Sequence, residues 1–288
     1  MPDRQRPRPD NVGASVRHRL LTLAHARGQP MELLLTRYAL ERLLHRLSLS
    51  PHRERFVLKG AMLLATWFHE PYRATRDVDL LGFGDAAEDA LRATFREIMA
   101  IKVDDGVNFD LKGLRIEAIR EQVEYGGSRL RTTATLAGAR IPITVDIGFG
   151  DAVEPGVDDI DLPVLLDMPS PHLRAYPPET VIAEKFHAMV VLGKANSRMK
   201  DYYDVRMLTR AFEIDPVRLR RAIGATFARR NTVIPSVIPD GLSEAFSIDP
   251  DKRRQWHAFA RNLSGPVPEF GLVVSDLRQR LVGFLAVR

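Results

Sequence analysis

Two stretches decide the fold, Phe56-Val-Leu-Lys-Gly-Ala61 and, a little further on, Arg73-Ala-Thr-Arg-Asp-Val-Asp79. In the first, a short apolar run ends at Gly60, which predicts a buried strand that turns directly into a helix. The second leads into another strand, which begins at Asp77. Because side chains alternate along a strand, Asp77 and Asp79 should lie on the same face.

This acidic pair predicts a metal site. Two neighbouring carboxylates repel each other unless a cation offsets their charge. Mg²⁺ prefers hard oxygen ligands and leaves room for substrate phosphates, so we expect Asp77 and Asp79 to be catalytic metal ligands. A glycine at a helix N-terminus lets an anion approach the backbone, so Gly60 and the neighbouring Lys59 are predicted to contact nucleotide phosphates. Arg76, beside the acidic pair, is predicted to contact a nucleotide phosphate as well, although it could simply offset the carboxylates. A tight strand-to-helix turn alone would also explain Gly60.

A third acid, Asp146, lies within the apolar stretch Ile143-Thr-Val-Asp-Ile147. If its strand lies beside the strand of Asp77, three carboxylates converge as metal ligands. Such a trio can hold two Mg²⁺ ions, or one ion plus a base for the attacking hydroxyl. A strand-end cap or a pair with an arginine would explain Asp146 equally well.

Periodicity predicts helices, then a mixed sheet, then more helices. We expect a flexible basic tail over residues 1–12, a core domain with N-terminal helices over 13–168, and a helical domain over 169–288. Residues 151–167 read as a linker. The predicted helices are 15–26, 30–47, 61–69, 86–100, 179–192, 199–212, 216–229 and 272–287; the strands are 56–58, 77–83, 116–120, 128–137 and 140–148. The fold class is therefore α/β (α+β) with a partly antiparallel sheet.

The composition excludes several kinds of functional site. The 288 residues carry a net charge of +5 and no cysteine, which excludes disulfides, thiolate metal sites and cysteine nucleophiles. The longest nearly apolar run, Ala61–Phe68, is far shorter than the roughly 20 residues of a membrane helix. We therefore expect a cytoplasmic protein without membrane contact. Arginines over Val217–Arg230 suit a polyanionic partner or a solvated helix face.

The order strand, glycine, helix, acidic strand and later acid resembles nucleotidyltransferases of the polymerase-β type. The two opening stretches further resemble the AbiEii/AbiGii family, the nucleotidyltransferase toxins of type IV toxin–antitoxin systems, to which the mycobacterial MenT toxins are related. That family usually opens with Lys-Gly-Gly, whereas this chain has Ala61 at the third position.

Two later motifs extend the resemblance. Tyr176–Met189 resembles the family's A-E-K helix, and Met199–Val205 its K-D-x-Y-D helix. The resemblance implies that Lys185 and Asp204 are catalytic, with Lys185 at the nucleotide phosphates. Lys185 lies on an apolar helix, where an unpaired charge would be costly. A salt bridge between Lys185 and Asp204 would also satisfy both.

The resemblance implies transfer of a nucleoside monophosphate from an NTP to RNA, with the tRNA 3′ end as the favoured acceptor and translation as the process blocked. Asp146 or Asp204 would activate the acceptor hydroxyl. It also implies a cognate antitoxin encoded nearby, with or without direct binding. Three alternatives remain: a small-molecule or protein hydroxyl as acceptor, a catalytically silent RNA-binding module of the same fold, and metal-dependent hydrolysis.

Thr75 lies two residues before Asp77 and so shares its expected face. A phosphate on Thr75 would place a dianion against the metal site. We therefore predict that phosphorylation of Thr75 would switch the enzyme off.

Overall fold

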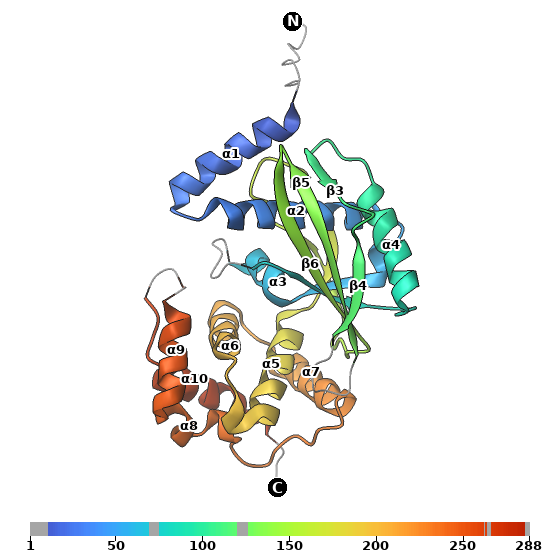
Figure 1. Cartoon of the computed structure of the whole chain (residues 1–288). Coiled ribbons are helices and arrows are strands. Elements are labelled where there is room, and N and C mark those ends of the chain that lie inside the picture. Colours follow the sequence, from blue (N-terminus) through green and yellow to red (C-terminus); the bar gives the residue numbers. More distant parts are fainter. Residues whose placement is uncertain (1–10, 69–74, 120–125, 262, 264–265, 286–288) are drawn as a thin grey trace, which may run out of the picture. The chain divides into compact units, whose positions relative to one another are not determined.

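The computed structural model describes residues 11–68, 75–119, 126–261, 263 and 266–285 (Figure 1). The chain forms two compact units, Met1–Gly150 with Asp159–Ala175 and Asp151–Asp158 with Tyr176–Arg288, here called the sheet unit and the helical unit. The tail predicted for residues 1–12 lies outside the described residues except for its last two. Arg73 and the predicted helix end at residue 69 also lie outside them.

The sheet unit is built on an eight-stranded mixed sheet in the order β3-β5-β6-β2-β1-β8-β7, with β4 paired to β5. β2 pairs with β1 antiparallel and with β6 in parallel, while β1 pairs with β8 in parallel. The strands are β1 Phe56–Lys59, β2 Val78–Gly82, β3 Val107–Phe109, β4 Arg115–Ile119, β5 Gly127–Leu136, β6 Ala139–Phe149, β7 Asp158–Asp161 and β8 His172–Ala175.

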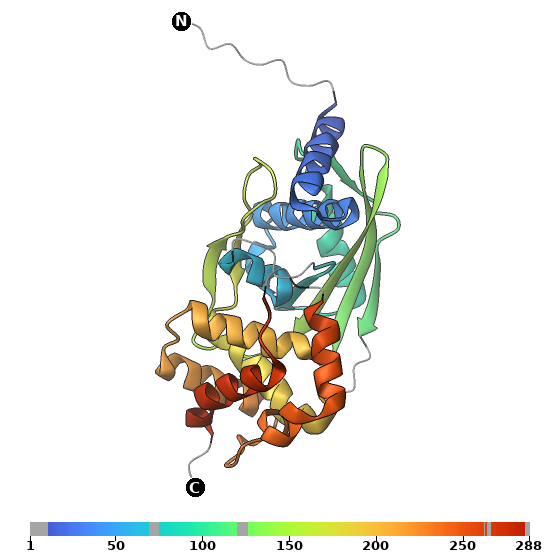
Figure 2. The ribbon, with the colours of Figure 1, turned by 90° about the vertical axis from the view of Figure 1, so that its left-hand side faces the viewer.

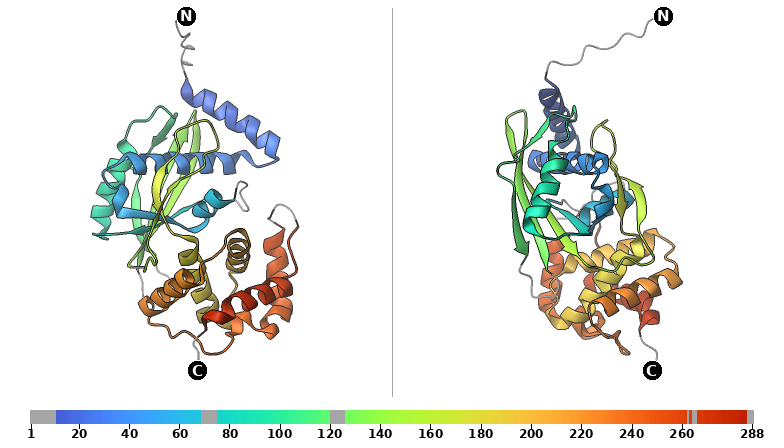
Figure 3. Two further views of the ribbon diagram at one scale, coloured as in Figure 1. Left: turned by 180° about the vertical axis from the view of Figure 1, so that it is seen from behind. Right: turned by 90° about the vertical axis from the view of Figure 1, so that its right-hand side faces the viewer.

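The sheet curves around helix α2 (Met31–Leu49), with β5 and β6 on one side and β7 and β8 on the other (Figures 2 and 3). Every residue of α2 from Tyr38 to Leu47 is therefore buried. The remaining helices of this unit are α1 (Val12–Arg27), α3 (Gly60–Trp67) and α4 (Glu88–Ala100).

Burial on all sides forces the charged groups of α2 to find partners. Arg46 forms a bidentate pair with the buried Asp105, at 2.6 and 3.1 Å. Glu41 accepts a hydrogen bond from the backbone N–H of Leu165 at 3.0 Å, and burial raises the pKa of this carboxyl above its ordinary value. These contacts tie α2 to the loops on either side of it.

Alternation along β6 gives the sheet two different faces. Val145 and Ile147 are buried on the face toward α2, which we call the inner face. Asp146 and its neighbours two residues away point to the opposite, outer face. Since β2 and β6 are in register, Asp79 lies on the outer face as well.

The helical unit has a core in which Tyr202 stacks on Phe246 and meets Phe270 edge-on. Asp215, Ser243 and Asp249 cap helix N-termini through their side chains. The helices are α5 Pro178–Leu192, α6 Met199–Ala211, α7 Pro216–Arg229, α8 Glu244–Ile248, α9 Pro250–Ala260 and α10 Phe270–Leu281. Within the described residues, no helix has the length and apolar character needed to cross a membrane.

The mixed α/β architecture agrees with the sequence prediction, and three details differ. Asp77 precedes β2 instead of opening it. The predicted linker over residues 151–167 contains β7. The short strands β3 and β8 lie where no strand was predicted.

Candidate active site

Asp79 occupies the centre of a three-strand arrangement. In the antiparallel pairing of β1 with β2, Asp79 is opposite Lys59. In the parallel pairing of β2 with β6, the same residue is opposite Asp146. Two carboxylates and one amine thus come from three neighbouring strands at one level of the sheet, and the described structure brings together Lys59, Asp79 and Asp146 as the sequence predicts.

Gly60 fixes where the carboxylate of Asp79 can lie. The glycine has a φ of +72°, and a β-carbon added to it would lie 1.9 Å from Asp79 Oδ2 and 2.6 Å from Asp79 Cγ. Such distances are far inside van der Waals contact. The carboxylate therefore fills the space that a side chain would take, at the N-terminus of α3. This steric reason for a glycine differs from the phosphate approach that the sequence suggested.

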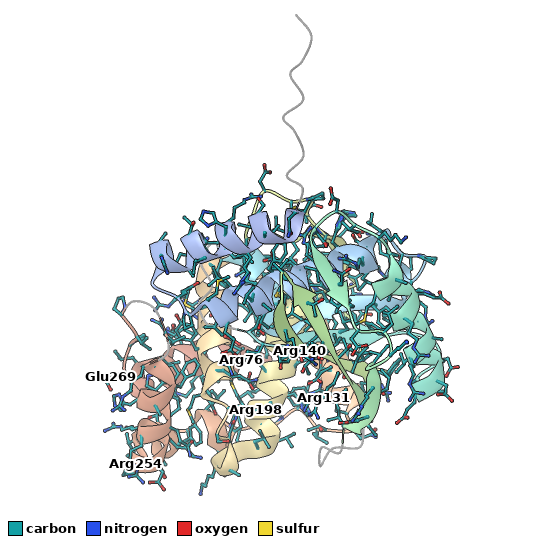
Figure 4. All side chains as sticks on the ribbon, turned by 45° about the horizontal axis from the view of Figure 1, so that its top comes forward. Arg76, Arg131, Arg140, Arg198, Arg254 and Glu269 are labelled. Atoms are coloured by element: carbon teal, nitrogen blue, oxygen red, sulfur yellow. The ribbon has the colours of Figure 1, made fainter. Side chains whose placement is uncertain are left out.

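Asp77 is half-buried immediately before β2, and Thr75 binds it directly. The hydroxyl of Thr75 donates to the backbone oxygen of Asp77 at 3.0 Å and lies 3.1 Å from its Oδ1. The expected proximity of Thr75 to an active-site carboxylate is therefore present. Arg76, labelled in Figure 4, is exposed.

Asp146 is held by an arginine that sequence reasoning missed. Arg129 on β5 donates through Nε to Oδ1 at 2.7 Å and through Nη2 to Oδ2 at 2.6 Å. The two side chains are 35% and 19% exposed, so the pair lies at the edge of solvent. Of the roles open to Asp146 in the sequence, the arginine pair is the one present in this structure.

The side chains at the site can be compared with the ligands that Mg²⁺ requires. Among the residues that the structure describes, no group of three or more His, Cys, Asp or Glu side chains is arranged to hold a metal ion. The two carboxylates of Asp77 and Asp79 nevertheless fit Mg²⁺, which commonly uses one or two carboxylates together with substrate phosphates and water. Asp146 would have to exchange Arg129 for an ion. The three-carboxylate metal set remains a prediction.

A second charged cluster lies inside the helical unit. Lys185 Nζ donates to Asp201 Oδ1 at 2.7 Å and lies 3.0 Å from Asp204 Oδ2. Burial lowers the pKa of Lys185, but the attraction of Asp204 and Asp201 outweighs it and raises the pKa above the ordinary value. The lysine is therefore a fixed cation. The salt bridge that the sequence allowed for Lys185 and Asp204 is present, with Asp201 as a further member.

His187, two residues from Lys185, belongs to a different set of contacts. Its ring lies 3.0 Å from the hydroxyl of Thr232 and 3.3 Å from Arg230 Nη1, and it packs edge-on against Phe227. Burial first, and then the charge of Arg230, lower the pKa of His187 to about 4. The neutral ring is a packing residue.

The mixed sheet, the glycine turn and the acids on adjacent strands fit a nucleotidyltransferase, and the sequence profile shows the family. The chain belongs to the AbiEii family, the nucleotidyl transferase AbiEii toxins of type IV toxin–antitoxin systems, whose sequence profile matches residues 42–280. This family implies a nucleotide substrate and an antitoxin partner.

One solved structure supports the fold, and a second has a lower TM-score. JHP933 from Helicobacter pylori is 15% identical, with a TM-score of 0.51, over 87% of this chain and 92% of that protein. A second H. pylori structure, provisionally described as a nucleotidyltransferase, is 16% identical over 85% of this chain and 92% of that one, with a TM-score of 0.48. No curated protein matches the sequence.

Proposed function

We propose that this protein transfers a nucleoside monophosphate from an NTP to an RNA hydroxyl, at the tRNA 3′ end, in a Mg²⁺-dependent reaction. One observation carries the proposal. Asp79, seated against Gly60, is in register with Asp146 on the neighbouring parallel strand, so two acids share one face beside a helix N-terminus. Phosphoryl transfer needs such positioning and charge more than covalent chemistry.

Asp77 and Asp79 would hold the metal. When bound, Mg²⁺ neutralises phosphate charge and stabilises the charge that develops during transfer. Thr75 orients Asp77 through its hydroxyl, and Gly60, which has no β-carbon, leaves room for the carboxylate of Asp79. The two carboxylates therefore need little rearrangement to act as ligands, which keeps the entropic cost of assembling the site low.

Cationic groups would hold the triphosphate. Lys59 lies opposite Asp79, and Gly60 opens α3, whose N-terminus favours an anion. Lys185 carries three N–H donors, of which its two carboxylate partners take two, so one donor is left for a phosphate oxygen. Arg76 is exposed and adjacent to Asp77, and we assign it to the outer phosphates.

Asp146 is the better candidate for activating the acceptor hydroxyl. Its side chain is 19% exposed, whereas that of Asp204 is 3% exposed and contacts Lys185. A general base must reach the proton that it removes. We therefore assign base function to Asp146, once the bond with Arg129 opens, and assign Asp204 to positioning Lys185. The attacking oxygen bonds to the α-phosphorus, and pyrophosphate leaves.

In the cell, nucleotides added to the tRNA 3′ end would block aminoacylation and stop translation. This outcome suits a family of toxins and places the proposed site of action in the cytoplasm, where tRNA is charged. The family's antitoxin partner would limit this activity, with or without direct contact.

The test incubates the purified protein with total tRNA, Mg²⁺ and each α-labelled NTP in turn. Two variants with the same charge change accompany it, Asp79→Asn and Asp89→Asn; Asp89 lies on α4 and is 93% exposed. We expect the wild type and Asp89→Asn to label tRNA and release pyrophosphate, Asp79→Asn to do neither, and EDTA to abolish labelling.

Other outcomes discriminate between the alternatives. Labelling of a protein or a small molecule instead of tRNA would overturn the RNA acceptor. Loss of phosphate from the NTP without any labelled acceptor would indicate hydrolysis. Binding of tRNA without labelling by any NTP would indicate a silent binding module.

A further inference from the structure

The outer face of strands β4, β5 and β6 carries a row of mostly polar side chains. Alternation and register bring these residues to one side of the sheet, opposite the apolar inner face. Arg131 is opposite Arg115 on one side and Thr144 on the other, and Thr135 is opposite Arg140. The outward-facing residues are Arg115, Glu117, Ile119, Gly127, Arg129, Arg131, Thr133, Thr135, Arg140, Pro142, Thr144, Asp146 and Gly148.

Charge on this face is unbalanced. The outer face of these strands carries four arginines and two acidic residues, and Arg129 is paired with Asp146. Arg131 lies 3.3 Å from Glu117, with both half exposed. Arg115 and Arg140 are exposed and form no ion pair with any residue that the structure describes.

Exposed arginines on helices α4 and α9 behave differently. Arg92 pairs with Asp89 and Glu88 one helical turn away, and Arg254 pairs with Asp251. Their charges are offset locally. The surplus on the outer face is therefore a property of these strands, and it matches an anionic partner.

The row begins at the candidate active site. Asp146 is in register with Asp79. The six steps along β6 from Asp146 back to Arg140 cover about 20 Å, at roughly 3.3 Å per step. Figure 4 labels Arg131 and Arg140 on these strands. A chain whose end reacts beside Asp79 can follow the strands past several cationic groups.

The composition favours a phosphate backbone over bases. Arginine guanidinium and threonine hydroxyl groups are common donors to phosphate oxygens. Thr133 and Thr144 add hydroxyls between the arginines. No outward-facing residue of the row is aromatic, so the face offers no platform for base stacking.

We propose that Arg115, Arg131 and Arg140, with the threonines between them, bind the phosphate backbone of the RNA acceptor and guide its 3′ end toward Asp79. This inference rests on the proposed RNA acceptor. It adds the acceptor's path and a binding mode that is independent of base sequence.

The experiment measures binding of total tRNA to the full-length protein at several salt concentrations. The test variant is Arg115→Gln/Arg140→Gln, and the matched control is Arg92→Gln/Arg254→Gln, which removes the same charge. With about 0.7 counterions released per single-strand phosphate contact, the salt slope of the test variant should fall by about 1.4, and affinity near 0.15 M salt by roughly tenfold. The control should remain within twofold of wild type. Thermal unfolding checks that both variants are folded.

A charge-preserving variant, Arg115→Lys/Arg140→Lys, should restore the wild-type salt slope because counterion release depends on charge. Equal slopes for the glutamine variant and wild type, with labelling of tRNA intact, would overturn this inference alone. Failure of the wild type to bind or label RNA would overturn the proposed acceptor and this inference together. An equal loss of tRNA affinity in the Arg92→Gln/Arg254→Gln control would mean that only the net charge of the protein matters. That result would also overturn this inference.

Discussion

Replacing Gly60 by alanine tests how the site is built. The added β-carbon would lie 1.9 Å from Asp79 Oδ2, whereas ordinary contact begins near 3.4 Å, so the carboxylate must move by the difference, 1.5 Å. Displacing a catalytic group by about 1 Å can lower the rate by about 100-fold. The left-handed backbone of Gly60 adds about 1–2 kcal/mol of strain for alanine.

Gly28→Ala is the matched control. Gly28 ends α1 with a φ of +60°, and no atom lies within 4 Å of the position that its β-carbon would take. It therefore carries the same backbone strain without a clash. Both variants should unfold a few degrees below wild type, at about 2–4 °C per kcal/mol for a protein of this size.

The rate of tRNA labelling distinguishes Gly60→Ala from Gly28→Ala. Gly28→Ala should keep its transfer rate, and Gly60→Ala should lose about 100-fold or more while remaining folded. A Gly60→Ala protein that transfers nucleotides within a few-fold of wild type would refute the idea that the glycine positions Asp79.

Three further predictions concern charge. Lys185→Met leaves two carboxylates buried without their cation, so the free energy of unfolding in urea should fall by about 3–5 kcal/mol; a loss below about 1 would contradict the buried pair. Burial and Arg230 lower the pKa of His187 to about 4, so its contribution to stability is complete above the ordinary pKa near 6.5 and decreases as pH falls toward 4. His187→Gln should flatten that pH dependence, worth up to about 3 kcal/mol; an unchanged slope would rule His187 out as its source. Thr75→Asp puts an anion beside the Asp77 carboxylate and should lower transfer at least tenfold, roughly 1.4 kcal/mol of barrier, and full activity would end the phosphorylation hypothesis.

Local patterns predicted the elements whose signals are local. Helices α5, α6 and α7 begin and end within one residue of the predicted bounds, because their apolar spacing is explicit in the chain. Prolines also mark the starts of α5 and α7. The strand–glycine–helix sequence at Lys59 and Gly60 is equally visible.

Elements that depend on distant partners were missed. β8 is a short strand that pairs in parallel with β1, with Leu58 opposite Ala175. So short a run has no periodicity of its own. The burial of Arg46 was equally hidden, because a sheet that curves around a helix is not readable from that helix.

The pairing of Asp146 with Arg129 could have been predicted from the sequence. The turn at Ala137-Gly138 sets the register of β5 with β6, opposite each other at Leu136 and Ala139. Counting seven residues outward from each leads to Arg129 and Asp146. Asp201 and Asp204 are three residues apart and so share one face of α6, which allows both to contact Lys185.

The pairing of β1 with β8 also means that one edge of β1 stays unpaired during synthesis until β8 has been made. Leu58 leaves the ribosome 117 residues before Ala175, its partner. At about 5–20 residues per second, the edge of β1 waits on the order of 10 s for β8. An apolar strand edge left open is a template for pairing with other chains. Each newly made toxin molecule thus passes through an interval in which chaperones or proteases have access to it before the sheet is complete.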